Sequence, residues 1–219
     1  VAAFRDLCIH RGTALSLGWI ENGSLVCPYH GWTYSPDGIC VRIPSLPARH
    51  AIPAKARATA VFAAKERYGL IWVCLAEPRA SIPEIPELDD PRYHTFFHST
   101  DVWETSAARI IENFIDTSHF PYVHPGINAT RDDPIIPDFE VRQNGLELSF
   151  ETKFGAPSGG AFRGPAALAS YRAFTEGRRQ YRVVLPFTAQ AIRPMEEGRR
   201  QLVSIIASPI SARRMRYYT

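Results

Sequence analysis

The sequence predicts an α+β protein of two domains, a small all-β domain followed by an antiparallel sheet with one long helix. Residues 1–77 contain short apolar runs separated by turn residues, a pattern typical of antiparallel strands. After a proline-rich segment, one helical apolar stripe is followed by runs in which apolar and polar residues alternate. We therefore expect domains at 1–77 and 92–219, joined by a linker at 78–91.

Turn residues place three hairpins in the first domain. Asn22-Gly23 lies within residues 17–26 between apolar neighbours, and Asn-Gly is the strongest short signal for a hairpin. The second hairpin turns at Ser35-Pro-Asp-Gly38, and the third turns at Glu66-Arg-Tyr-Gly69. These strands predict a small antiparallel sandwich.

Proline and acidic residues dominate the segment Glu77–Pro91 (EPRASIPEIPELDDP). Proline cannot donate to a ladder, so we expect a linker or an ordered strap here rather than a helix or strand.

The second domain is expected to contain one long helix and several strands. Ala107–His119 carries an apolar stripe at helical spacing, and Pro121 is expected to end the helix. An irregular loop should begin at Pro125-Gly126. Strands are predicted at 146–154, 180–185 and 201–207.

Composition excludes several functional classes. The hydrophobic fraction of 45% and charged fraction of 21% are those of an ordinary globular protein. The net charge of +3 is too small and scattered to indicate nucleic-acid binding. No apolar run is long enough to span a membrane, and no signal peptide is visible. Cys40 and Cys74 lie in strand-like sequence and are expected to be small buried residues, which favours a reducing, cytoplasmic compartment.

Two short motifs offer metal ligands in matched pairs, Cys8-x-His10 and Cys27-x-x-His30. Structural zinc is the alternative for two cysteines and two histidines, but zinc sites usually pair like ligands on each loop. One cysteine and one histidine per loop suits a two-iron cluster in which one iron takes both thiolates and the other both imidazoles.

The sequence around these pairs closely resembles the Rieske [2Fe–2S] motif. It reads Cys8-x-His10-Arg11-Gly12 and Cys27-Pro28-Tyr29-His30-Gly31-Trp32, and CPYHGWTY is similar to the form in aromatic ring-hydroxylating oxygenase α subunits. The resemblance implies that Cys8, His10, Cys27 and His30 hold the cluster. It implies a one-electron relay whose exit is His10 or His30.

A second motif, Asn113-x-x-Asp116-x-x-His119 followed by His124, is similar to the mononuclear-iron motif of the same family. Without that context, a histidine pair beside an apolar helix indicates core or surface packing equally well. Two histidines and a carboxylate form the facial triad of non-haem Fe(II) oxygenases. The resemblance implies that His119 and His124 bind Fe(II), that Asp116 bridges to a cluster histidine of a neighbouring subunit, and that Asn113 lies near the iron.

One expected ligand is missing. The family takes its third ligand from an aspartate on a C-terminal helix, whereas Asp132, Asp133 and Asp138 follow His124 too closely in a proline-punctuated loop. We expect the third carboxylate beyond Thr219, and therefore expect the chain to be a fragment, truncated at both ends. Glu112 is expected to be a solvated or structural carboxylate.

The resemblance implies a function and a fold. The fold is a Rieske domain followed by an incomplete, helix-grip-like catalytic domain. The activity is that of an oxygenase component taking electrons from NAD(P)H through a reductase, with or without a ferredoxin, and using O2 to hydroxylate or demethylate an aromatic or polycyclic substrate. The segments Ile43–Pro47, Glu66–Trp72 and Glu112–Pro121 look most like the vanillate O-demethylase branch. That resemblance implies a homotrimer with electron transfer between neighbouring subunits. A cis-dihydroxylating dioxygenase α subunit and a Rieske electron carrier without oxygenase activity are the alternatives.

Overall fold

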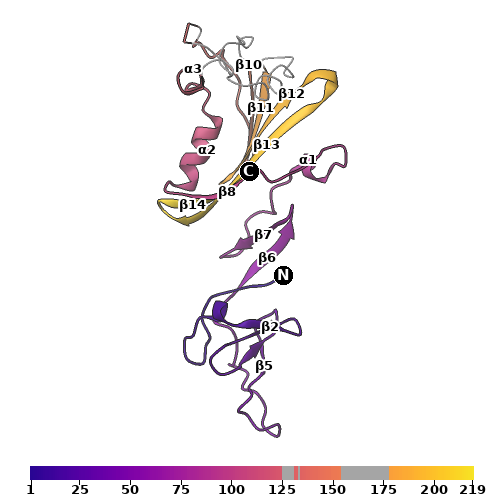
Figure 1. Cartoon of the computed structure of the whole chain (residues 1–219), viewed down its shortest axis with the longest axis vertical. Helices are drawn as coiled ribbons and strands as arrows, with labels where there is room; N and C mark the ends of the chain where they lie inside the picture. Colours follow the sequence, from indigo (N-terminus) through magenta and orange to yellow (C-terminus); the bar gives the residue numbers. More distant parts are fainter. Residues whose placement is uncertain (125–130, 133, 154–177) are drawn as a thin grey trace. The chain divides into compact units, whose positions relative to one another are not determined.

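The computed structural model describes residues 1–124, 131–132, 134–153 and 178–219. The chain divides into two compact units, Val1–Glu84 and Ile85–Thr219, each described here by itself (Figure 1). The first unit is all-β and the second is α+β, so the predicted fold class is confirmed. Among the described residues, no helix is long and apolar enough to cross a membrane.

The first unit contains two antiparallel sheets, one of four strands in the order β2-β3-β4-β5 and one of three in the order β1-β6-β7. Its elements are β1 (Ala3–Phe4), the 3-10 turn η1 (Leu15–Leu17), β2 (Trp19–Glu21), β3 (Ser24–Val26), β4 (Thr33–Tyr34), β5 (Cys40–Arg42), β6 (Val61–Arg67) and β7 (Leu70–Cys74). The three predicted hairpins are confirmed as β2–β3, β4–β5 and β6–β7. Asn22 and Gly23 have φ values of 49° and 75°, as the tight turn between β2 and β3 requires.

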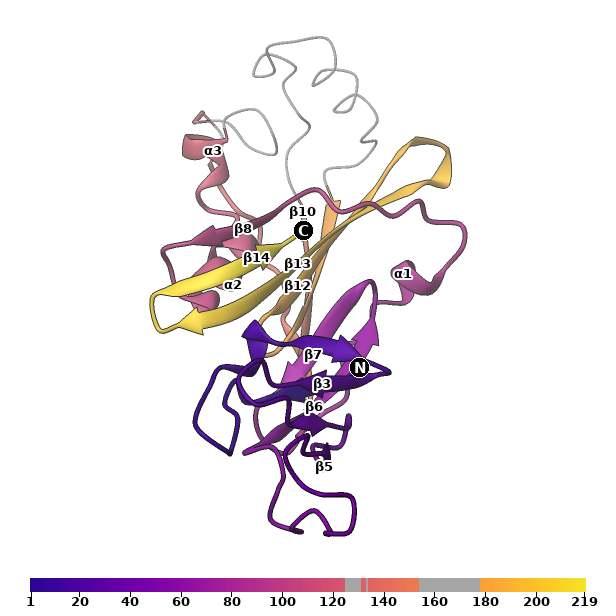
Figure 2. The same cartoon turned by 60° about the horizontal axis from the view of Figure 1, so that its bottom comes forward.

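The second unit is built on a seven-stranded antiparallel sheet in the order β8-β14-β13-β12-β11-β10-β9. Its strands are β8 (Thr100–Trp103), β9 (Arg142–Asn144), β10 (Glu147–Lys153), β11 (Arg178–Val184), β12 (Thr188–Pro194), β13 (Arg200–Ser211) and β14 (Arg214–Tyr218). Figure 2 shows β12, β13 and β14 side by side, as their pairing requires. The strands predicted at 146–154, 180–185 and 201–207 are β10, β11 and β13; Phe154 and the predicted loop at Pro125-Gly126 lie outside the described residues.

Helix α2 (Ala107–Ile115) covers one face of this sheet (Figure 1). Ser106 caps its first turn, accepting a hydrogen bond from the Arg109 amide at 3.2 Å. Ile110 and Ile111 pack against the sheet, and the core that they form contains these buried residues: Ala107, Ile110, Ile111, Val183, Ala189, Ile205, Ala207 and Met215. Packing of this apolar face, rather than helix propensity, is what stabilises a helix of nine residues.

Three local predictions need correction. Helix α2 ends at Ile115 instead of His119, and Pro121 lies in the first turn of a second short helix, α3 (Phe120–Val123), instead of ending the first. Proline is tolerated in a first turn because the amide that it lacks has no partner there. The segment Glu77–Pro91 contains the helix α1 (Pro86–Asp89), again with proline at its start. Cys74 is half-buried, whereas Cys40 is buried as expected.

Candidate metal centres

The two cysteine–histidine motifs form loops of matching backbone geometry. In the first loop, the Gly12 amide donates to the Cys8 carbonyl at 2.8 Å; in the second, the Gly31 amide donates to the Cys27 carbonyl at 3.0 Å. Both glycines have positive φ, 74° and 70°, a conformation that costs glycine little. Each loop therefore returns sharply after its cysteine and presents its histidine beside that of the other loop.

The four predicted ligands of the cluster come together in this unit. Cys8 and Cys27 are buried, with 2% and 1% of their surface exposed. The rings of His10 and His30 lie with centroids 4.5 Å apart at 66°. The Nδ1 atom of His10 is buried and has no hydrogen-bond partner. Binding a metal would satisfy this otherwise unpaired nitrogen. The donor set and this orphaned nitrogen fit a Rieske cluster.

Within the part of the chain that the structure describes, no three His, Cys, Asp or Glu side chains converge closely enough to hold one metal ion. A two-iron cluster does not need such a group, because each iron takes only two ligands from the protein and the rest from sulfide. One cysteine and one histidine on each loop match that division of ligands.

Two aromatic residues complete the first centre. Trp32 stacks on His10 with ring centroids 4.6 Å apart and planes at 6°, covering one face of that imidazole. Tyr34 is fully buried, and its hydroxyl lies 3.2 Å from the Sγ of Cys8. Tyr34 was not predicted to be a site residue, although it lies within the CPYHGWTY motif.

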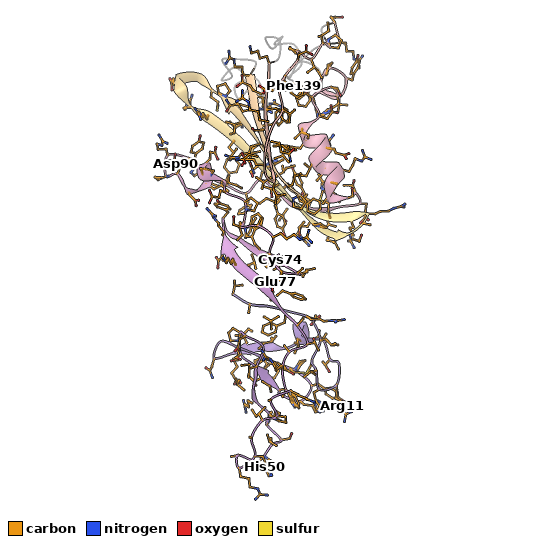
Figure 3. The ribbon with its side chains drawn as sticks, turned by 180° about the vertical axis from the view of Figure 1, so that it is seen from behind. Arg11, His50, Cys74, Glu77, Asp90 and Phe139 are labelled. Carbon is orange, nitrogen blue, oxygen red and sulfur yellow. The ribbon has the colours of Figure 1, made fainter. Side chains whose placement is uncertain are left out.

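Burial sets the protonation of these groups. Burial raises the pKa of the Cys27 thiol, so binding a metal there would release a proton. Desolvation, then the nearby His30 and Arg11, lowers the pKa of His10 and favours the neutral imidazole that metals bind. Figure 3 labels Arg11, which is exposed on the same loop. Burial, then the contact with Cys8, raises the pKa of Tyr34.

The second candidate centre lies at the turn between α2 and α3. Asp116 is the residue that ends α2, and its Oδ1 accepts hydrogen bonds from the amide and hydroxyl of Ser118 at 2.8 and 2.5 Å. Its Oδ2 lies 3.0 Å from Nδ1 of His119. Burial acts to raise the pKa of Asp116, but the hydrogen bonds from Ser118 and His119 outweigh it and lower that pKa. The carboxylate and imidazole thus meet across the turn that follows α2.

This contact defines which nitrogen of His119 is available. With Nδ1 engaged by Asp116, Nε2 is left to bind a metal. The ring of His124, at the end of α3, has its centroid 5.3 Å from that of His119. Phe120 contacts both imidazoles, with centroids 4.7 Å from His119 and 6.0 Å from His124. His119 and His124 therefore lie close together, and the Asp116 carboxylate contacts the Nδ1 side of His119.

The other residues considered from sequence lie at the surface. Asn113 is exposed on α2, and Glu112 is exposed and paired with Arg109 at 2.7 Å, as expected of a solvated carboxylate. Asp132 and Asp138 are exposed, and Asp133 lies outside the described residues. The remaining histidines are also exposed: His50, His94 and His98. Figure 3 shows His50 at the tip of the loop between β5 and β6.

One further residue near the second centre was not apparent from sequence. Arg179, on β11, is buried, and its guanidinium carbon lies 5.1 Å from the centroid of the Phe120 ring. No motif connects positions so far apart in the chain, and an arginine pair such as Arg178-Arg179 usually indicates a solvated surface.

Two known protein families match separate parts of the chain. Residues 1–62 match the Rieske [2Fe-2S] domain, and residues 103–219 match the vanillate O-demethylase oxygenase C-terminal domain.

Curated relatives include two demethylases of Pseudomonas putida. Methylxanthine N1-demethylase NdmA is 41% identical over 142 residues, covering 62% of this chain and 39% of that protein. Methylxanthine N3-demethylase NdmB is 31% identical over 228 aligned residues, covering 100% of this chain and 60% of that protein. The chain therefore spans less than two thirds of the length of either relative.

Solved structures show the same fold. NdmA of Pseudomonas putida CBB5 with caffeine superposes with a TM-score of 0.85 at 28% identity, covering 99% of this chain and 60% of that chain. Dicamba monooxygenase bound to dicamba superposes with a TM-score of 0.75 at 25% identity, covering 99% of this chain and 65% of that chain. The chain belongs to the Rieske oxygenase family, with a C-terminal domain of the vanillate O-demethylase type.

Proposed function

We propose that this chain forms the oxygenase component of a Rieske non-haem iron monooxygenase that hydroxylates or oxidatively demethylates an aromatic or polycyclic substrate. Electrons would come from NAD(P)H through a reductase, with or without a ferredoxin. Similarity to NdmA and NdmB, both named as demethylases, supports demethylation rather than cis-dihydroxylation. In that reaction one oxygen atom of O2 enters a methyl C–H bond, the other is reduced to water, and the hydroxymethyl group leaves as formaldehyde.

The observation that carries this proposal is the pairing of Asp116 with His119 beside His124, in a chain that also presents the cysteine–histidine loops. An electron carrier has no use for a second metal site. We assign Cys8, His10, Cys27 and His30 to the cluster and His119 and His124 to a mononuclear Fe(II), with a further carboxylate completing the triad. The cluster would supply single electrons, and the iron would supply oxygen activation.

The protein's own groups position these centres. Asp116 holds the Nδ1 side of His119, so that Nε2 faces the metal. Its side chain is 41% exposed, and the ring of His30 lies at the surface of its unit. We therefore propose a head-to-tail homotrimer in which a cluster histidine of one subunit approaches Asp116 of the next. Asn113, exposed on α2, is proposed to act near the same centre.

Iron counting and product analysis test the proposal. The holoprotein should contain one iron more than the cluster accounts for, and the double variant His119→Ala/His124→Ala should lose that iron while keeping the cluster's visible absorbance. With a reductase and a panel of methoxylated and N-methylated aromatics, O2 uptake should match formaldehyde release. A protein holding only cluster iron and consuming no O2 with any substrate would be an electron carrier, and the proposal would fail.

A further inference from the structure

A buried arginine lies on the helix-covered face of the sheet. Along β11, Arg179, Tyr181 and Val183 alternate onto one face, and Val183 packs in the core with α2. Arg179 is only 4% exposed. Arginine is rarely buried this deeply unless its guanidinium is bound by other groups, so its contacts indicate its role.

The guanidinium of Arg179 connects the sheet to α3. Its Nη1 donates a hydrogen bond to the hydroxyl of Tyr181 at 3.1 Å. Its central carbon lies 5.1 Å from the ring centroid of Phe120 and 5.9 Å from that of Tyr181, both within the range of cation–π contacts. Tyr181 is itself held by a stack with Phe150, with centroids 4.8 Å apart at 14°. The arginine therefore contacts Phe120 from a rigid position.

Phe120 also contacts the two proposed iron ligands. It directly follows His119, and its ring lies within 4.7 Å of His119 and 6.0 Å of His124, measured between centroids. Helix α3 has four residues, too few to be stable in isolation. Its orientation must come from tertiary contacts, and buried Phe120 supplies such a contact on the side facing the sheet.

We propose that Arg179 is a positioning residue for the mononuclear iron centre: it fixes Phe120 against the sheet and thereby sets the mutual orientation of His119 and His124. Arginine suits this role because its planar group can stack on a ring and donate a hydrogen bond at the same time, which a lysine ammonium cannot do. This inference rests on the proposed function, because it assumes that the two histidines bind Fe(II).

A lysine substitution separates geometry from charge. A buried cation near Fe(II) opposes metal binding by repulsion, so removing the charge would mix two effects of opposite sign. Arg179→Lys keeps the charge and removes the stacked plane. We expect roughly tenfold weaker Fe(II) binding, which is the size of one desolvated cation–π contact. We also expect a broadened EPR signal from the nitric oxide adduct of the ferrous site, reflecting a wider range of ligand geometries.

Arg182→Lys is the matched control. It changes an arginine of the same strand whose side chain points to the opposite face, where it contacts Gln190 and Glu87 at 2.9 and 2.8 Å. This variant should keep the wild-type Fe(II) affinity and nitrosyl spectrum. Cluster absorbance, which reports on the other unit, should be unchanged in both variants.

Phe120→Leu removes the ring without touching the buried charge, and it keeps the proposal testable should the arginine variant fold poorly. We expect it to broaden the nitrosyl signal as Arg179→Lys does, and the double variant to be no worse than either single one, because both remove the same contact. Wild-type Fe(II) affinity and spectra in both single variants would overturn the positioning role while leaving the proposed function intact. Wild-type protein that binds no Fe(II) beyond the cluster would instead overturn the proposed function.

Discussion

The hydroxyl of Tyr34 lies 3.2 Å from the Sγ of Cys8, and both residues are buried. A hydrogen bond donated to a ligand sulfur stabilises the reduced, more negative cluster more than the oxidised one, and so raises the reduction potential. If Cys8 binds the cluster it does so as a thiolate, so the Tyr34 hydroxyl would be the donor and would tune the cluster without binding it.

Tyr34→Phe is therefore expected to lower the reduction potential of the cluster. A differential hydrogen-bond energy of about 1 kcal/mol corresponds to ~40 mV for one electron. Redox titration followed by visible absorbance measures the shift. Tyr29→Phe is the control, since the Tyr29 side chain is exposed and its ring contacts His30 at a tilt of 37°. Equal potentials in Tyr34→Phe and wild type would show that the hydroxyl does not donate to Cys8.

Asp116→Asn is expected to reduce product formation by roughly 100-fold, the upper range for groups that orient metal ligands. The carboxylate charge facing His119 is lost, whereas the oxygen that accepts from Ser118 remains. At saturating Fe(II) both metal sites should stay filled, and chemical reduction of the cluster should be normal. Asp138→Asn, at an exposed carboxylate, should match wild type. Turnover at the wild-type rate in Asp116→Asn would contradict the role assigned to this residue.

Gly18→Ala should destabilise the first unit strongly. A Cβ atom there would lie 2.0 Å from the carbonyl oxygen of Val26, the residue before Cys27. Because backbone must move, we expect a loss of about 3 kcal/mol and poor cluster retention. Gly23→Ala, in open space at φ 75°, should cost only the conformational strain of about 1 kcal/mol. Thermal unfolding and iron content measure both effects, and equal losses would refute the steric explanation.

The pairing of Glu87 with Arg182 should stabilise the second unit. Their atoms are 2.8 Å apart, with side chains only 15% and 18% exposed. Removing one partner leaves the other charge poorly solvated, so Glu87→Ala is expected to cost about 3 kcal/mol in unfolding free energy. Glu140→Ala removes an exposed pair with Arg142 and should cost less than about 0.5 kcal/mol. Urea unfolding of the two variants should therefore differ clearly, and similar midpoints would refute the difference in burial as the cause.

Asp6 makes the stability of the first unit depend on pH. Its carboxylate accepts hydrogen bonds from the amide and hydroxyl of Ser16 at 2.7 and 2.8 Å, and the amide bond, then the hydroxyl bond, lowers the pKa of Asp6. A group whose pKa is lowered by folding stabilises the protein fully above its unfolded pKa of 3.8 and loses that contribution as pH falls through the folded value. Asp6→Asn should thus unfold at lower urea than wild type at pH 7, with the gap closing in acid. A gap independent of pH would argue against an ionised carboxylate.

Local chemistry explains what the sequence could predict. The hairpin at Asn22-Gly23 depends only on two residues that accept positive φ, and the four proposed cluster ligands occur as two pairs, each within one loop. Strand β12, which is buried on both faces, was not predicted. Residues Thr188–Ala191 do alternate between polar and apolar side chains, but the apolar positions are alanines, which are depleted in strands and give a weak signal.

Other features depend on contacts that no local pattern contains. Helix α2 ends where the Asp116 side chain binds Ser118 instead of letting the helix continue, four positions before the expected end at His119. Arg179 and Phe120 meet only because β11 and α3 are brought together by the sheet and its helix. No local sequence pattern predicts this contact, which is visible only in the folded domain.

The order of strands in the second unit also bears on how the protein behaves at high concentration. Among the described residues, the two edge strands of the seven-stranded sheet are its shortest, β8 with four residues and β9 with three. An edge strand exposes unpaired backbone groups that can recruit strands from other molecules. Few positions are therefore available along β8 and β9 themselves, which disfavours intermolecular sheet growth at these two strands.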